Sequence, residues 1–323
     1  MSFHIINVDT PRASLTCRDG QMICRSDDGS PERCLPLEDV ASVIITSFSA
    51  TIHSHLLLQA AQHGVSFLFC ENFKPASILL PANRCTDTLL TRAVIGMDPK
   101  TRHALWQKTI DAKVKNQLTL ARHIAPTDKR LTELERMASG KNPAREAACA
   151  KYYWAILSTA LTLDRFTRER HGGGLNHLLN YGYAVLLSCV LQKLTALGLD
   201  PVFGINHVVR ERCAALAYDL MEPFRPCVDA RVLSWVQRFP HGDLAEGAPS
   251  AFEVSKEYRV WVTSFTVERV GHLDLELDVR GVIEGVCRSF RRAVMAKRSG
   301  IYKPWTPNDS KWAGSLSPLT FPS

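Results

Sequence analysis

The character of the sequence changes near residue 98, and this change limits the possible folds more than any other feature. Residues 3–80 contain short apolar and β-branched runs separated by turn signals, among them Val43-Ile44-Ile45, a pattern typical of strands. From Asp98 onward the apolar residues recur at helical spacing, as in the long stretch 100–123, which favours helices. We therefore predict an α+β protein in which an N-terminal β-rich domain is followed by an all-helical domain.

The same patterns suggest where the domains end. Residues 1–85 form the β-rich domain, which carries little charge and which we interpret as a packing or dimerisation domain. Residues 86–97 are expected to be a linker, and residues 98–303 the helical domain, with a short strand at residues 258–262. Residues 304–323 form a Pro-rich C-terminal tail, which we expect to be poorly ordered because few of its groups would be tied down.

Composition excludes several classes of protein. The chain has 323 residues, 46% of them hydrophobic, and a net charge of +7, as expected for a soluble protein with a sizeable core. Its ten cysteines include no Cys-x-x-Cys pair, so we expect neither a structural zinc site nor a disulfide scaffold, but reduced thiols in a cytoplasmic protein. The N-terminus does not resemble a signal peptide, and no apolar run approaches the ~20 residues that span a bilayer, so we expect no membrane association.

Residues 201–226 hold the sharpest cluster of polar groups. Asp219 and Glu222 are three positions apart, so a helix places both carboxylates on one face. Pro223 disfavours continuation of that helix, which predicts two acids at a helix end, near the surface and next to Arg225. His207 precedes Glu222 by fifteen residues, roughly 22 Å along an unbroken helix. The two side chains can share an ion only if the chain bends, and we predict that bend at residues 208–213.

Each candidate residue also has an ordinary structural explanation. Glu146 lies in the first turn of a predicted helix, where an acid complements the helix dipole. His207 alone is more often a packed loop histidine than a ligand. Asp219 and Glu222 alone could be a helix-end pair that forms ion pairs with Arg225 or Arg212. Together, however, a glutamate, a histidine and one or two further carboxylates form a mixed oxygen and nitrogen shell that suits Mg²⁺ or Mn²⁺.

Such a hard cation can activate a water or a nucleic-acid hydroxyl and neutralise charge on a phosphodiester. The end of the chain offers a matching basic segment. After Glu284 the only acid is Asp309, and the excess of positive charge suggests a polyanion partner. The candidate phosphate-binding residues there are Arg288, Arg291, Arg292 and Lys297. A solvated helix face followed by a loose tail explains the same composition.

Several motifs together resemble the CRISPR-associated integrase family, the first and near-universal Cas protein of spacer adaptation. The resemblance covers nearly the whole chain. Its motifs are residues 219–226 followed by Val228-Asp229, residues 178–184, residues 198–201 with Gly204 and His207, and residues 145–148 ahead of Tyr152-Tyr153-Trp154.

The resemblance implies that the helical domain is catalytic, that Glu146, His207 and Glu222 bind the metal, and that Asp219 is a secondary acid. It further implies cleavage and integration of double-stranded DNA, the protospacer and the CRISPR repeat. The implied partners are a second copy of the chain and the small ferredoxin-like second Cas protein, in a prokaryotic cytoplasm. Arg225 joins the basic candidates for DNA binding.

Two other hypotheses stand beside this one. A non-catalytic nucleic-acid-binding scaffold would use only the basic segment, and its binding would survive EDTA and depend steeply on salt. A helical di-iron carboxylate protein would need a repeated Glu-x-x-His pair, which this sequence lacks.

Overall fold

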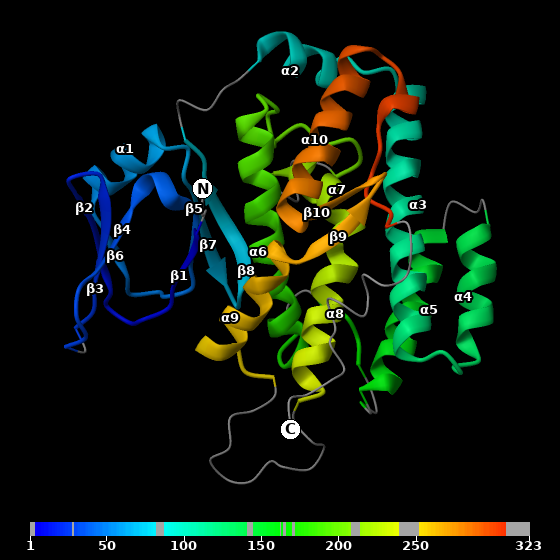
Figure 1. Cartoon of the computed structure of the whole chain (residues 1–323), viewed down its shortest axis with the longest axis horizontal. Helices are drawn as coiled ribbons and strands as arrows, with labels where there is room; N and C mark the ends of the chain where they lie inside the picture. Colours follow the sequence, from blue (N-terminus) through cyan, green and yellow to red (C-terminus); the bar gives the residue numbers. More distant parts are fainter. Residues whose placement is uncertain are drawn as a thin grey trace.

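The computed structural model describes residues 4–27, 29–81, 87–140, 145–161, 163, 166–169, 172–207, 214–238 and 252–307. A unit of strands at the N-terminus lies beside a larger unit built mainly of helices (Figure 1). The predicted α+β fold class is therefore confirmed. The dimerisation role of the first unit stays a prediction.

The N-terminal unit consists of two small sheets and a helix. Its elements are β1 (His4–Val8), β2 (Ser14–Arg18), β3 (Gln21–Arg25), β4 (Arg33–Pro36), β5 (Val40–Ile45), β6 (Thr51–Ile52), α1 (Ser54–Gln62), β7 (Ser66–Glu71) and β8 (Lys74–Leu79). One sheet has the order β1-β5-β7-β8 and the other β4-β3-β2-β6. In the first sheet β1, β5 and β7 are parallel, whereas β8 is antiparallel to β7.

Strand β5 is buried along its whole length because both of its faces are covered. Val43 and Ile45 pack in the core of the N-terminal unit, whereas Ile44 between them packs in the helical core. This alternation is the two-residue period of a strand, and it explains why the run is apolar without a gap. The two units thus share one sheet, and α6 (Leu175–Ala196) covers the helical side of it (Figure 1).

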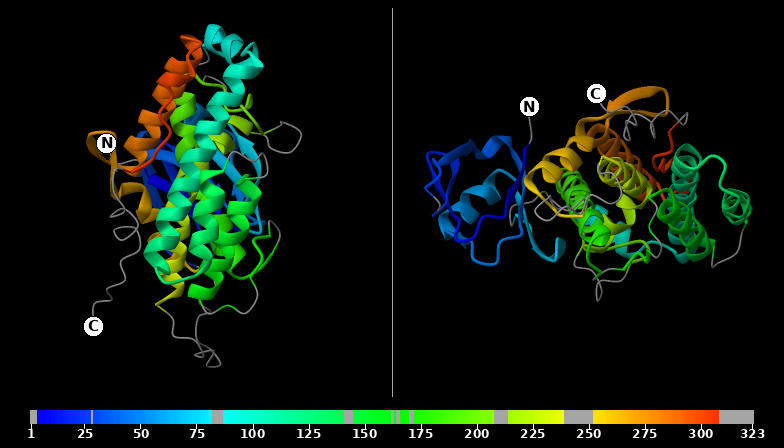
Figure 2. Two further views of the ribbon diagram at one scale, coloured as in Figure 1. Left: turned by 90° about the vertical axis from the view of Figure 1, so that its right-hand side faces the viewer. Right: turned by 90° about the horizontal axis from the view of Figure 1, so that it is seen from below.

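The helical unit is organised around α6, which is buried over most of its length. The other helices are α2 (Thr88–Ile95), α3 (Pro99–Ile124), α4 (Arg130–Ser139), α5 (Arg145–Ala160), α7 (Ala215–Met221), α8 (Arg225–Val236), α9 (Lys256–Thr263) and α10 (Val279–Met295). Figure 2 shows α3, α4 and α5 on the side away from the N-terminal unit. Among the described helices, none is both long and apolar enough to cross a bilayer.

The predicted strand at residues 258–262 is wrong, because this segment lies in α9. Ser255 caps the helix by accepting a hydrogen bond from the Tyr258 amide at 3.1 Å. Tyr258 and Val262, four residues apart, are buried on one helical face. Capping and packing thus outweigh the β preference of the valines and the aromatic residues. The helical unit does contain a hairpin, β9 (Arg269–His272) with β10 (Leu275–Asp278), which the all-helical prediction missed.

Both predicted segment boundaries in this unit also need correction. The predicted linker at residues 86–97 contains α2, whose first turn is capped by the carboxylate of Asp87. The start of the predicted C-terminal tail is packed against the helical unit, since Trp305 is fully buried and stacks on Phe224 with ring centroids 5.3 Å apart. Residues 308–323 of that tail lie outside the described residues.

Candidate active site

The two acids at residues 219 and 222 lie inside the protein. Helix α7 ends at Met221, and the chain continues as a 3-10 turn, η2 (Glu222–Phe224), into α8, in keeping with a proline at position 223. Asp219 is 0% and Glu222 3% exposed, so the prediction that both lie near the surface is wrong. The reason is that α7 packs against both α6 and α3, and its other residues are almost all apolar.

Asp219 fixes the loop that carries His207. One carboxylate oxygen, Oδ2, accepts hydrogen bonds from the amides of Ile205 at 2.5 Å and Asn206 at 3.1 Å. The other, Oδ1, accepts one from the His207 amide at 3.2 Å and lies 2.6 Å from Nδ1 of the imidazole. Because a carboxylate accepts hydrogen bonds, this contact favours the neutral tautomer of His207 that has its proton on Nδ1 and its lone pair on Nε2. Asp219 therefore presents His207 in the tautomer that a metal ligand needs.

The bend predicted at residues 208–213 lies outside the described residues. On either side of that segment, His207 and Asp219 are in direct contact. The imidazole also packs edge-on against Trp106, with centroids 5.9 Å apart, and lies near the ring of Tyr218.

Glu146 and Glu222 converge on a single ammonium group. Nζ of Lys113, from the middle of α3, lies 2.7 Å from Oε1 of Glu146 and 2.8 Å from Oε2 of Glu222. The other oxygen of Glu222 lies 3.2 Å from Arg225. Helix α5 and the turn η2 thus bring the carboxyl groups of two predicted metal ligands together at the side chain of Lys113.

The charges of this cluster support one another. Burial opposes ionisation of Glu222, but the positive charges of Arg225 and Lys113 outweigh it and lower the pKa of Glu222 to about 2. Burial likewise opposes the charge on Lys113, yet Glu222 and Glu146 together raise the pKa of Lys113. Glu222 and Lys113 therefore both stay charged at neutral pH despite their burial.

The side chains present fit a hard divalent cation in their chemistry. Two carboxylates and one imidazole nitrogen suit Mg²⁺ or Mn²⁺, and Oε2 of Glu222 is buried without a well-formed hydrogen bond. In the part of the chain that the structure describes, no three His, Cys, Asp or Glu side chains are gathered closely enough to hold one ion. The ammonium group of Lys113 stands between the two carboxylates instead. Glu146, Glu222 and Nε2 of His207 are the groups that would hold a metal.

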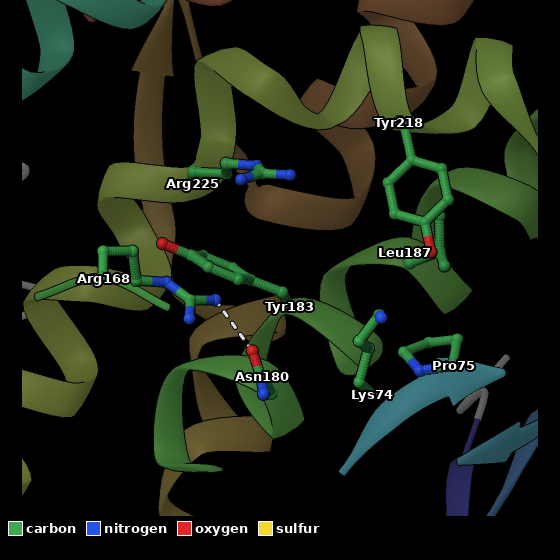
Figure 3. A pocket seen from close by; sticks show the side chains of 8 residues that line it. All are labelled: Lys74, Pro75, Arg168, Asn180, Tyr183, Leu187, Tyr218 and Arg225. Carbon is green, nitrogen blue, oxygen red and sulfur yellow. Dashed lines mark hydrogen bonds between the residues drawn. The ribbon is translucent and has the colours of Figure 1, made fainter. Parts of the chain in front are cut away.

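Arg225 of this cluster also lines a pocket, to which Lys74 and Pro75 of β8 contribute (Figure 3). Its volume is about 210 Å³, and its lining residues are Lys74, Pro75, Arg168, Asn180, Tyr183, Leu187, Tyr218 and Arg225. The guanidinium groups of Arg225 and Arg168 lie 4.8 and 5.4 Å from the ring centre of Tyr183. Arg168 also donates a hydrogen bond to Asn180 at 2.8 Å. The wall of the pocket is therefore cationic and aromatic.

A family model described as CRISPR associated protein Cas1 matches residues 6–263. The chain belongs to this family. The prediction made from the sequence motifs is thereby confirmed.

Two curated relatives show how far the similarity extends. The chain is 33% identical over 204 residues to the CRISPR-associated endonuclease Cas1 of Neisseria meningitidis serogroup C, an alignment that covers 62% of this chain and 66% of that protein. It is 27% identical over 312 residues to the CRISPR-associated endonuclease Cas1 4 of Methanospirillum hungatei, covering 92% and 90% respectively.

Solved Cas1 and casposase structures have the same fold. A casposase bound to integration product has a TM-score of 0.70 and 19% identity, with 96% of this chain and 95% of that chain aligned. A chain of a Cas6-RT-Cas1–Cas2 complex has a TM-score of 0.74 and 15% identity, covering 94% and 36%. A CAS1 protein from Thermotoga maritima has a TM-score of 0.73 and 15% identity, covering 90% and 97%. At these identities the likeness shows the fold alone.

The basic residues predicted to bind DNA differ in their surroundings. Arg288 forms an ion pair with Glu284 at 2.6 Å, and Arg291 forms one with Asp87 at 3.2 Å. Arg292, in the last turn of α10, and Lys297, just after that helix, are exposed. Arg225 contacts Glu222, as described above. DNA binding by all five stays a prediction.

The sequence reasoning missed the role of Lys113. A signal for it was present: Lys113 lies three residues after Ile110 and beside Val114, on the apolar stripe of a long helix, where a lysine is rarely buried unless paired. Asp229 was likewise recognised only as part of a motif, although it accepts hydrogen bonds from Tyr183 at 2.5 Å and Tyr153 at 2.7 Å.

Proposed function

We propose that this chain is a metal-dependent DNA endonuclease and strand-transferase of CRISPR adaptation. In this reaction a 3′-hydroxyl of protospacer DNA attacks a phosphodiester of the CRISPR repeat. The observation that carries the proposal is the meeting of Glu146 and Glu222 at one point in a chain of the Cas1 family. The imidazole of His207 is oriented separately by Asp219. The names of the endonuclease relatives and of the casposase structure support this activity over a non-catalytic scaffold.

The residues divide the work between binding and positioning. Glu146, Glu222 and His207 supply the ligand atoms. Asp219 holds the proton on Nδ1 of His207 and fixes the loop before it. A divalent cation bound there supplies Lewis-acid chemistry, lowering the pKa of the attacking hydroxyl and neutralising charge on the phosphodiester. Arg225, held against Glu222, adds a fixed positive charge beside the reacting phosphate.

The partners follow from the same proposal. Double-stranded DNA is the substrate in both roles, as protospacer and as repeat. A solved structure of similar fold is named as a Cas1–Cas2 complex, which supports a small second Cas protein as the partner of this chain. A homodimer formed through the N-terminal unit completes the proposed assembly.

The experiment is a strand-transfer assay with a labelled protospacer, a repeat-bearing plasmid and Mg²⁺ or Mn²⁺. Glu222→Gln and His207→Ala should each lower the rate of joining by about 100-fold or more, because charge stabilisation at the phosphodiester is lost. The matched control is Glu133→Gln, since Glu133 forms an ion pair on the outer surface of α4. Circular dichroism verifies that each variant is folded.

A folded His207→Ala or Glu222→Gln protein that joins DNA at the wild-type rate would contradict the site. DNA binding that survives EDTA, with no joined product under any metal, would favour the scaffold hypothesis instead.

A further inference from the structure

Lys113 occupies the place where the two candidate metal-ligand carboxylates meet. Its side chain is 11% exposed, and its Nζ contacts one oxygen of Glu146 and one of Glu222 at hydrogen-bonding distances. Within α3 the neighbouring side chains of Ala112 and Val114 are buried. The helix therefore holds the ammonium group at the carboxylates.

A divalent cation and this ammonium group compete for the same oxygens. Mg²⁺ bonds to carboxylate oxygen at about 2.1 Å and to several oxygens at once, so it would have to stand where Nζ now lies. We propose that Lys113 is a built-in counter-ion of the carboxylate pair, which a divalent cation displaces when it enters the site. This inference rests on the proposed function, because that function requires the metal.

The need for such a counter-ion follows from burial. Glu222 has a side chain 4% exposed, and a buried carboxylate without a partner is strongly destabilising. Arg225 neutralises one of its oxygens and Lys113 the other. The ammonium group thereby keeps the site folded and assembled when no metal is bound.

The direction of displacement can be read from exposure. The side chain of Glu146 is 39% exposed whereas that of Glu222 is 4% exposed, so the open side of the cluster is at Glu146. A lysine can swing its charged head toward solvent while its aliphatic stem stays on the apolar stripe of α3. Metal binding would thus turn a protected lysine into an accessible one.

The test is amine acetylation of the wild-type full-length protein, quantified for each lysine by peptide mass spectrometry. Without metal, Lys113 should react slowly. With saturating Mn²⁺ its rate of acetylation should rise by about fivefold or more. The reason is that fewer molecules then hold Lys113 against the two carboxylates, where it is protected from the reagent. Lys115, exposed on the same helix, is the internal control and should react at the same rate throughout. Unchanged protection of Lys113 when Mn²⁺ is bound would overturn the proposal.

Metal affinity gives a second, independent measurement. Isothermal titration should show that Lys113→Met binds Mn²⁺ about tenfold more tightly than wild-type protein and the Lys115→Met control, because no ammonium group has to leave. Equal affinities in the three folded proteins would count against displacement.

Failure of the proposed metal site can be distinguished from failure of the counter-ion proposal. If Glu222→Gln and His207→Ala bind Mn²⁺ as well as wild-type protein does, the proposed metal site is wrong. If both variants lose Mn²⁺ while Lys113 stays protected in the metal-bound wild type, only the counter-ion proposal fails. Should Lys113→Met not fold, the acetylation result on wild-type protein decides.

Discussion

At the scale of single residues, the site depends on a third buried acid, Asp229, besides Asp219 and Glu222. Asp229 accepts hydrogen bonds from Tyr153 and Tyr183, and the guanidinium of Arg225 lies over the ring of Tyr183. Arg225 in turn contacts Glu222. Asp229 thus positions Arg225 through Tyr183, so the charge beside Glu222 is held in place by packing and hydrogen bonding.

The titration of Asp229 should be visible in the stability of the protein. Burial raises the pKa of Asp229 to about 6, although the two tyrosine hydroxyls and nearby arginines oppose the rise. A raised pKa in the folded state stabilises the protein below the unfolded pKa of ~3.8, and this contribution is lost as the pH rises through the folded pKa. Relative to Asp229→Asn, wild-type protein should lose about 3 kcal/mol of unfolding free energy over the whole transition, at 1.36 kcal/mol per pKa unit, of which about 2 kcal/mol is lost between pH 4 and 6.

Urea denaturation of both proteins without metal, at several values of pH, measures this difference. Parallel curves of stability against pH for the two proteins would show that Asp229 does not titrate in this range.

The candidate site residues were easier to identify from the sequence than their burial and their contacts. The spacing of Asp219 and Glu222 correctly placed both at the end of a helix. Their burial was missed because it depends on the packing of α7 against α6 and against α3, and α3 is distant in sequence. The pairing of Lys113 with two carboxylates was missed for the same reason: Glu146 and Glu222 are 33 and 109 positions away from it.

At the scale of elements, the loop before His207 is shaped by Asp219 and by a glycine. A Cβ atom added to Gly204 would lie 2.7 Å from Oδ2 of Asp219 and 2.8 Å from the carbonyl oxygen of His207. Neither contact can be relieved cheaply, since one group receives two backbone hydrogen bonds and the other is backbone. Only glycine fits this loop without moving the imidazole.

Gly204→Ala should therefore displace His207 without unfolding the helical unit. We expect strand transfer to fall by about tenfold to 100-fold, the range for lost support of a metal ligand, and Mn²⁺ affinity to fall with it. Gly300→Ala is the matched control, because an added Cβ there meets nothing within 4 Å. Normal Mn²⁺ affinity in Gly204→Ala would show that the loop can adapt.

Elements with a strong helical period were predicted well, whereas short ones were not. The long helix α3 spans Pro99–Ile124, close to the predicted 100–123. It was predicted well because apolar residues recur at helical spacing over many turns. Residues 258–262 are too few for the spacing of their apolar residues to distinguish a strand from a helix. The cap at Ser255 favours the helix. The short helix α2 was taken for a linker for the same reason.

At the scale of the whole molecule, the segment after α10 ties the site together. Asn116 of α3 donates hydrogen bonds to the carbonyl of Pro223 in η2 at 2.9 Å and to that of Trp305 at 3.0 Å. The indole of Trp305 stacks on Phe224, with the rings 5° from parallel, and donates a hydrogen bond to Gly271 in β9. Trp305 thus links α3, the turn η2 that contains Glu222, and the β9–β10 hairpin.

This link makes Trp305 a test of how the site is supported. Trp305→Ala should cost about 3–5 kcal/mol of unfolding free energy, the range for deleting a large buried aromatic side chain. It should also lower strand transfer under conditions where the protein is still folded, because Phe224 loses its stacking partner next to Glu222. Trp305→Phe keeps a ring on Phe224 but loses the hydrogen bond to Gly271, so it should recover most of the activity and only part of the stability. Comparing urea unfolding with joining rates separates the two effects: if stability falls while the rate per folded molecule stays at the wild-type value in both variants, the C-terminal segment supports the fold alone.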